Sequence, residues 1–121
     1  MDATIYHNPR CSTSRNALER VRAAGVEPRV VEYLKAPPGK AKLKQLLRQA
    51  GVPVREAVRS KEPVYAELGL DGASDDALLA AMVAHPVLIQ RPIVETGLGV
   101  RLCRPVEVVD EILPKPRAKQ R

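Results

Sequence analysis

Residues 3–16, ATIYHNPRCSTSRN, place a cysteine between a short apolar run and a segment with the composition of a helix. The run ATIYH is predicted to form a short buried strand that ends at His7. A helix is predicted to follow, with Ser12 or Thr13 as its N-cap. Cys11 therefore stands at a strand–helix junction. Its position alone leaves four roles open: nucleophile, half of a redox pair, metal ligand or small buried side chain.

The segments after this junction continue the pattern of a small mixed α/β domain. In chain order we predict a strand at RVVEYL (29–34), a helical insert over about residues 38–86, a hairpin of PIVET (92–96) and VRLCR (100–104), and a helix at PVEVVDEIL (105–113). The order βαβ, helical insert, ββα, with a cysteine after the first strand, resembles the thioredoxin-like plan, a small mixed sheet flanked by helices. We expect one domain over residues 1–114 and a basic, disordered tail at 115–121.

The positive charge of the chain is concentrated in that tail. The 121 residues carry a formal net charge of +6, and the terminal KPRAKQR contributes four of these charges without any acid. The rest of the chain is only mildly basic and has no Phe or Trp, so we expect no nucleic-acid partner. With no long apolar stretch and no export signal, the sequence predicts a cytoplasmic protein with free thiols and no membrane partner.

The surroundings of Cys11 favour a reactive thiol. The first-turn N–H groups of a helix stabilise an anion at its N-terminus, and they lower the pKa of a cysteine there. The hydroxyls of residues 12–14 are expected to add hydrogen bonds, and His7 and Arg15 to add positive charge. Three residues after Cys11 stands Ser14 instead of a second cysteine, so no local disulfide can form. A redox cycle then needs an outside thiol, for which glutathione is the obvious source.

The second cysteine, Cys103, lies within the predicted strand VRLCR. A buried, inert side chain is the favoured interpretation there, and a resolving thiol is the alternative. Two cysteines and two histidines scattered along the chain make a poor zinc site. We therefore expect no metal and no tightly bound cofactor.

Several motifs taken together resemble one known family. IYHNPRCSTSRN, EYLKAPP, VREAVR, YAELGL, HPVLIQRPIV and RLCRP are similar to segments of the arsenate reductases of the glutaredoxin-linked type, which belong to the thioredoxin-like superfamily. The resemblance runs from about Thr4 to Leu113. It implies an oxidoreductase in which a cysteine attacks arsenate, glutathione joins the arsenic, glutaredoxin reduces the mixed species, and arsenite leaves.

Matched motif by motif, the resemblance assigns six residues. The nucleophile falls on Cys11, the histidine that keeps the thiol ionised on His7, and the hydroxyl near the thiolate on Ser14. The three arginines that grip the oxyanion and the intermediate are Arg59, Arg91 and Arg104.

General chemistry agrees with the arginine assignment, because guanidinium groups bind tetrahedral oxyanions such as arsenate through paired hydrogen bonds. Arg91 also precedes Pro92, where thioredoxin-like folds place a cis proline that faces the cysteine and could fix the arginine's direction. Taken singly, each arginine is explained as well by a solvated or strand-capping side chain.

Three positions depart from the family pattern, which often has glycine after the nucleophile, an apolar residue after PIV and proline in the hairpin turn. This chain has Ser12, Glu95 and Gly97 at those places. Two other functions stay open. A glutathione-dependent thiol reductase needs Cys11 but not three arginines. A transcriptional regulator of the Spx type, which contacts RNA polymerase, typically carries a C-x-x-C switch that is absent from this sequence.

Overall fold

The computed structural model describes residues 1–114, and the prediction of a disordered tail at 115–121 lies outside them. The sheet has the strand order β2-β1-β3-β4. Its strands are β1 (Ala3–His7), β2 (Arg29–Glu32), β3 (Ile93–Thr96) and β4 (Gly99–Leu102). β1 pairs with β2 in parallel and with β3 antiparallel, and β3 and β4 form the antiparallel hairpin. The predicted fold class, a thioredoxin-like small mixed sheet flanked by helices, is confirmed.

The side chains of β1 alternate between the two faces of the sheet, and both faces are buried. Ile5 belongs to an apolar cluster with residues of α1 (Ser12–Ala23) and of the 3-10 helix η3 (Val106–Ile112). Tyr6 belongs to a second cluster, which the helical segment between β2 and β3 covers. Successive side chains of a strand point to opposite faces, so Ile5 and Tyr6 enter different clusters. The next residue, His7, therefore points toward α1.

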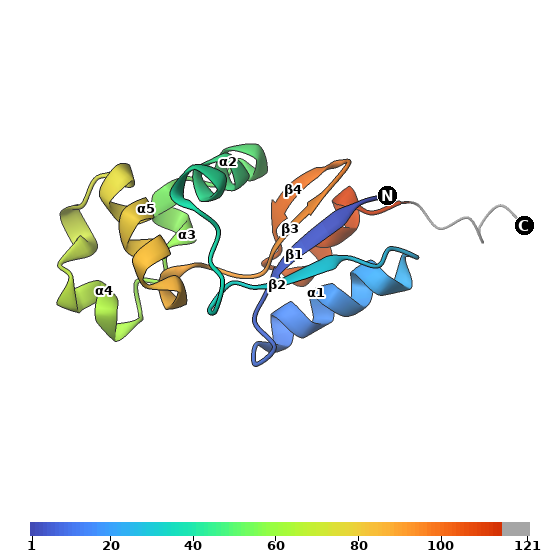
Figure 1. Ribbon diagram of the computed structural model, residues 1–121, viewed down its shortest axis with the longest axis horizontal. Helices are drawn as coiled ribbons and strands as arrows, with labels where there is room; N and C mark the ends of the chain where they lie inside the picture. The colour runs from blue at the N-terminus through green and yellow to red at the C-terminus, as the bar shows by residue number, and fades with distance from the viewer. Residues whose placement is uncertain (115–121) are drawn as a thin grey trace, which may run out of the picture.

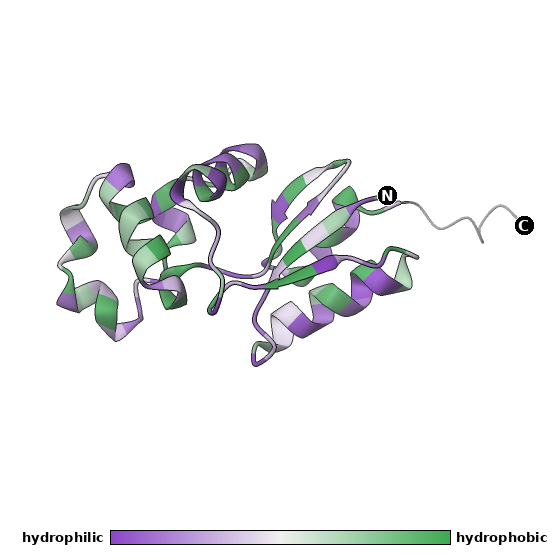
Figure 2. Ribbon diagram, viewed as in Figure 1, coloured by the Kyte–Doolittle hydropathy of each residue, from purple (hydrophilic) through white to green (hydrophobic). Residues whose placement is uncertain are grey.

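The segment between β2 and β3 is helical, as predicted. It contains α2 (Lys40–Ala50), α3 (Val54–Ala57), α4 (Pro63–Glu67), η1 (Leu70–Gly72), α5 (Asp75–Ala84) and η2 (Pro86–Leu88). Gly51 ends α2 with a φ of 71°, and Ser74 caps α5 by accepting a hydrogen bond from the Ala77 N–H. In Figure 1 these helices form a lobe beside the sheet, on the side away from α1. Figure 2 shows polar and apolar residues alternating along α1 and α2, as in helices with one buried side.

Two predicted helix starts differ from the structure. The N-cap of α1 is Cys11, and Ser12 is already helical, because the Cys11 carbonyl accepts the hydrogen bond from the Arg15 N–H at 3.0 Å. The last helix is of the 3-10 type, and Pro105 is its N-cap, not its first helical residue. The first difference matters for the chemistry, because it places the Cys11 thiol at the N-terminus of α1, where the first-turn N–H groups have no partner within the helix.

Candidate active site

The loop between β1 and α1 carries Cys11 at the carboxyl end of the two parallel strands. His7 is the last residue of β1 and pairs in register with Glu32, the last residue of β2. A turn follows, closed by a 3.0 Å hydrogen bond from the Cys11 N–H to the Asn8 carbonyl. Crevices at this end of parallel strands are where α/β proteins usually bind ligands.

The buried hydroxyl of Ser14 holds this loop against α1. Ser14 Oγ lies 2.7 Å from His7 Nδ1 and accepts a 3.0 Å hydrogen bond from the Asn8 N–H. The Asn8 side chain in turn accepts a hydrogen bond from the Arg10 N–H at 3.0 Å. Ser14 is thus occupied with the loop and with His7. Its backbone N–H, not its hydroxyl, acts on the thiol.

Burial tends to raise the pKa of the half-buried Cys11 thiol, but the groups around it reverse that effect. The N–H groups of Ser14 and Thr13 and the guanidinium of Arg91 together hold the pKa below its ordinary value. These N–H groups belong to the first turn of α1, where they have no partner within the helix. The positive charge of Arg91 acts in the same direction on the pKa of the thiol. The arrangement shifts the thiol toward the thiolate form, which is the nucleophile.

The charge expected on His7 is absent. The ring is buried, and burial lowers its pKa, so the imidazole is neutral at neutral pH. Arg15 does not approach the sulfur either, because its guanidinium donates a 2.9 Å hydrogen bond to the Pro9 carbonyl. Of His7, Arg15 and Arg91, Arg91 is the one whose positive charge lowers the pKa of the thiol.

The three predicted arginines approach the site from different directions. Arg91 lies before β3, next to the thiol, and its peptide bond to Pro92 is cis, as the resemblance implied. Arg59 forms a 3.2 Å ion pair with Glu62, and its charge reaches the hydroxyl of Tyr33. Arg104 is exposed and donates a 3.3 Å hydrogen bond to the Arg91 carbonyl. The structure thus brings Arg91 to Cys11 and the charge of Arg59 to Tyr33. Arg104 is connected to this group through its hydrogen bond to the Arg91 carbonyl.

Comparison with known proteins agrees with this geometry. The model of the ArsC family matches residues 6–112. The chain belongs to the ArsC family. An arsenate reductase of Rhizobium meliloti (strain 1021) is 57% identical over 116 residues, which cover 94% of this chain and 83% of that protein. An arsenate reductase of Escherichia coli (strain K12) is 53% identical over 113 residues, 92% of this chain and 80% of that protein.

Solved structures give the same result for the fold. An arsenate reductase from Vibrio cholerae superposes with a TM-score of 0.88 at 47% identity, covering 93% of this chain and 98% of that chain. The resemblance predicted from the motifs is therefore confirmed at the level of family and fold.

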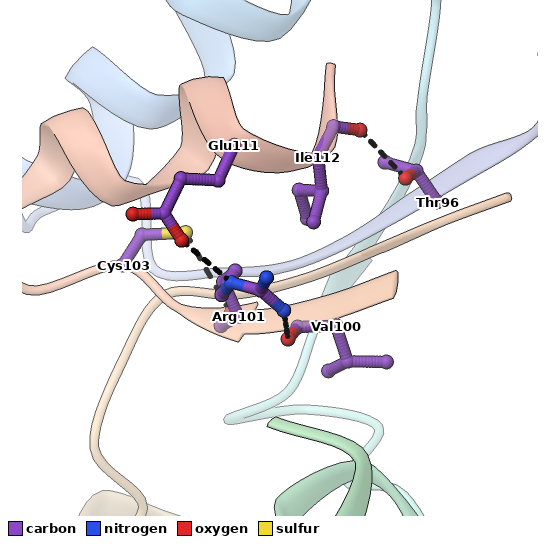
Figure 3. A network of polar contacts seen from close by, with 6 residues as sticks. All are labelled: Thr96, Val100, Arg101, Cys103, Glu111 and Ile112. Carbon is purple, nitrogen blue, oxygen red and sulfur yellow. Dashed lines mark hydrogen bonds and ion pairs between the residues drawn. The ribbon is translucent and has the colours of Figure 1, made fainter. Parts of the chain in front are cut away.

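The second cysteine of this ArsC-family chain, Cys103, is buried in the core. Cys103 is fully buried, and burial raises the pKa of its thiol to about 12. Figure 3 shows Cys103 under η3, with its sulfur directed at the Arg101 carbonyl, 3.6 Å away. Arg101 and Glu111 form a 2.9 Å ion pair beside it. A protonated, enclosed thiol is a poor nucleophile, which supports the interpretation of Cys103 as inert.

The residues that depart from the family pattern are either exposed or paired. Glu95 pairs with Lys42 of α2 at 3.2 Å, on the face of the sheet that the helical lobe covers. Its carboxylate is therefore neutralised locally, and it is not among the charges that act on Cys11. Ser12 is exposed at the start of α1, and Gly97 lies in the exposed hairpin turn.

One residue near Cys11, Tyr33, is not among the site residues predicted from the sequence. Tyr33 directly follows β2, and its buried hydroxyl lies in the field of Arg91, Arg59 and Cys11. The signal was available, since a residue after β2 must lie beside the residue after β1 when the two strands are parallel. In the sequence, Tyr33 only continues the predicted strand RVVEYL.

Within residues 1–114, no three His, Cys, Asp or Glu side chains form a group that could hold a metal ion. None of the helices in this range is long and apolar enough to cross a membrane.

Proposed function

We propose that this protein reduces arsenate to arsenite, with Cys11 as the nucleophile. The observation that carries the proposal is the Cys11 thiol at the N-cap of α1, with two first-turn N–H groups and Arg91 lowering its pKa. Arsenate reductases in the same family, more than half identical in sequence, support arsenate as the substrate.

In the first step the Cys11 thiolate attacks arsenic and forms a sulfur–arsenic bond. One arsenate oxygen takes up two protons and leaves as water, and arsenic stays As(V). The guanidinium of Arg91 stabilises the oxyanion beside the sulfur, since its planar fork suits two oxygens at once. Arg59, which is paired with Glu62 in the free protein, is the second arginine of the proposed substrate site. Arg104, tied to the Arg91 backbone, is the third arginine of the proposed substrate site.

His7 and Ser14 serve this step through position. Their contact at 2.7 Å, with the bond from the Asn8 N–H to Ser14 Oγ, fixes the loop that presents Cys11 to the helix N-terminus. The neutral imidazole keeps Ser14 in place without adding charge. The proposed role of both residues is thus to keep the thiol where the first-turn N–H groups can hold it ionised.

The electrons come from outside thiols. Reduction of As(V) to As(III) takes two electrons, and buried Cys103 is unsuited to form a disulfide with Cys11. We propose glutathione as co-substrate and glutaredoxin as protein partner. Glutathione joins the arsenic on Cys11, and glutaredoxin then reduces the mixed species and releases arsenite. In the net reaction two glutathione thiols become one disulfide and one arsenate oxygen becomes water. This chemistry needs thiols kept reduced, as in the cytoplasm.

The test is arsenite production by the purified protein from arsenate and glutathione, with glutaredoxin present or omitted. The proposal predicts arsenite formation that requires glutathione and is strongly accelerated by glutaredoxin. Hydroxyethyl disulfide, offered in place of arsenate with glutathione present and glutaredoxin omitted, is the matched substrate for a thiol reductase. Turnover of the disulfide without any arsenite from arsenate would contradict the proposal in favour of that activity.

A further inference from the structure

The hydroxyl of Tyr33 is an unexplained polar group in the protein interior. The side chain is only 1% exposed, and within residues 1–114 its Oη makes no hydrogen bond. Buried hydroxyls nearly always have a partner, because leaving one unpaired costs about 1–3 kcal/mol. A second polar atom nearby, the buried Nε of Arg91, has no hydrogen-bond partner in the same part of the chain.

The surroundings of this hydroxyl are those of the active site. Tyr33 is the first residue after β2, and β2 ends in register with His7, so Tyr33 lies beside Asn8 at the start of the Cys11 loop. Its hydroxyl feels the charges of Arg91, Arg59 and the Cys11 sulfur. The Asn8 side chain is close as well, but not in hydrogen-bonding geometry.

The Tyr33 hydroxyl is protonated and can therefore donate a hydrogen bond. Burial raises the pKa of Tyr33, and the nearby arginines offset this only in part, so the hydroxyl stays protonated at neutral pH. It does not donate to the Cys11 sulfur, which lies near enough to act on it electrostatically but is not bonded to it. What the hydroxyl lacks is an acceptor, and Arg91 Nε lacks one too.

We propose that the Tyr33 hydroxyl binds substrate, donating a hydrogen bond to an oxygen of the tetrahedral oxyanion held between Arg91 and Cys11. The assignment rests on the proposed function and extends its binding site by one residue. A bound oxyanion supplies the acceptor that both unpaired donors lack. As a neutral donor, the hydroxyl adds a bond to the anion without further stabilising the thiolate.

The experiment compares Tyr33→Phe with wild type and with a matched control, Tyr6→Phe. The control is also a buried tyrosine in the same apolar cluster, but the charges around it are Lys42, Glu95 and Arg29. Each variant removes one oxygen and keeps the ring. Two quantities are measured: the arsenate concentration that half-protects Cys11 from alkylation by iodoacetamide, and the pH dependence of alkylation without arsenate. Melting temperatures and KM for arsenate complete the comparison.

For Tyr33→Phe we expect the half-protecting arsenate concentration and KM to rise about tenfold or more, as for a lost hydrogen bond to a charged group. The melting temperature should equal or exceed the wild-type value, because the variant removes a buried hydroxyl that is unpaired within residues 1–114. The pH profile of alkylation should stay at the wild-type values, because the hydroxyl is not bonded to the Cys11 sulfur. Tyr6→Phe should leave protection, KM and the pH profile unchanged.

Either of two results would overturn the assignment. Equal arsenate protection in Tyr33→Phe and wild type would remove the hydroxyl from the binding site. A shift of the alkylation profile to higher pH would show that the hydroxyl serves the thiolate instead.

A wild type that arsenate neither protects nor engages as substrate would contradict the proposed function and this assignment together. A wild type that is protected and active, with Tyr33→Phe equal to it, would contradict the assignment alone.

Discussion

Removal of the Ser14 hydroxyl should reveal how much the Cys11 loop depends on one buried side chain. Ser14→Ala deletes an oxygen that lies 2.7 Å from His7 Nδ1 and accepts a 3.0 Å bond from the Asn8 N–H. The buried His7 nitrogen is left without a partner, at a cost of about 1–3 kcal/mol. The Asn8 N–H is only partly buried and reaches water, so its loss adds about 0.5–1 kcal/mol.

Together these terms predict a loss of about 1.5–4 kcal/mol in the free energy of unfolding. That is a large share of the stability of a small domain, and it corresponds to a melting temperature lower by about 10 °C. Urea unfolding followed by circular dichroism measures the change. Because the loop presents Cys11 to the helix N-terminus, alkylation of Cys11 at neutral pH should slow as well.

The matched control is Ser12→Ala, two residues earlier in the same turn. Ser12 is exposed, and its hydroxyl makes no hydrogen bond within the described residues. Its replacement should change the free energy of unfolding by less than about 0.5 kcal/mol. A Ser14→Ala protein as stable as Ser12→Ala would refute the reasoning, because it would show that the buried contact does not hold the loop.

Three further predictions concern the second thiol, the buried histidine and the arginine beside the sulfur. Cys103→Ala should keep arsenate reduction while lowering stability by about 1 kcal/mol, and lost turnover in a folded variant would make Cys103 a resolving thiol. Because burial places the folded-state pKa of His7 below its unfolded value, the unfolded chain binds the proton first as the pH falls. Stability should therefore decline below about pH 6.5, and a His7→Asn protein with equal pH dependence in urea unfolding would contradict this. Arg91→Lys should lower kcat/KM for arsenate about 10- to 100-fold, since an ammonium cannot replace the planar fork, and steady-state rates near wild type would exclude Arg91 from the site.

Local sequence patterns predicted the elements of the fold. The apolar run ATIYH, the stretch RVVEYL, the helical insert that starts near residue 38 and the final hairpin each correspond to observed elements. These signals are local, because a strand or an amphipathic helix needs only its own residues to set its period. The N-cap of α1 was misplaced by one or two residues. Serine and threonine are the usual caps, but the helix here begins so that Cys11 takes that position.

The electrostatics of the site depend on contacts that no local pattern contains. His7 was expected to carry charge, yet the packing of β1 against α1 buries it and keeps it neutral. The three arginines look equivalent in sequence, but Arg59 forms an ion pair with Glu62, and Arg104 donates its hydrogen bond to the Arg91 carbonyl. Tyr33 looks like part of a strand in the sequence. The surroundings of its hydroxyl come from Arg91, Arg59 and Cys11, which belong to three other segments of the chain.

The central claim is that the Cys11 thiolate carries the reduction. It is tested most directly by arsenate-dependent NADPH oxidation with glutathione, glutaredoxin and glutathione reductase, for wild type and Cys11→Ser side by side. The account predicts steady turnover for wild type and none above background for Cys11→Ser, which removes the sulfur at a half-buried position and should fold normally. Turnover that survives in a folded Cys11→Ser protein would contradict the account.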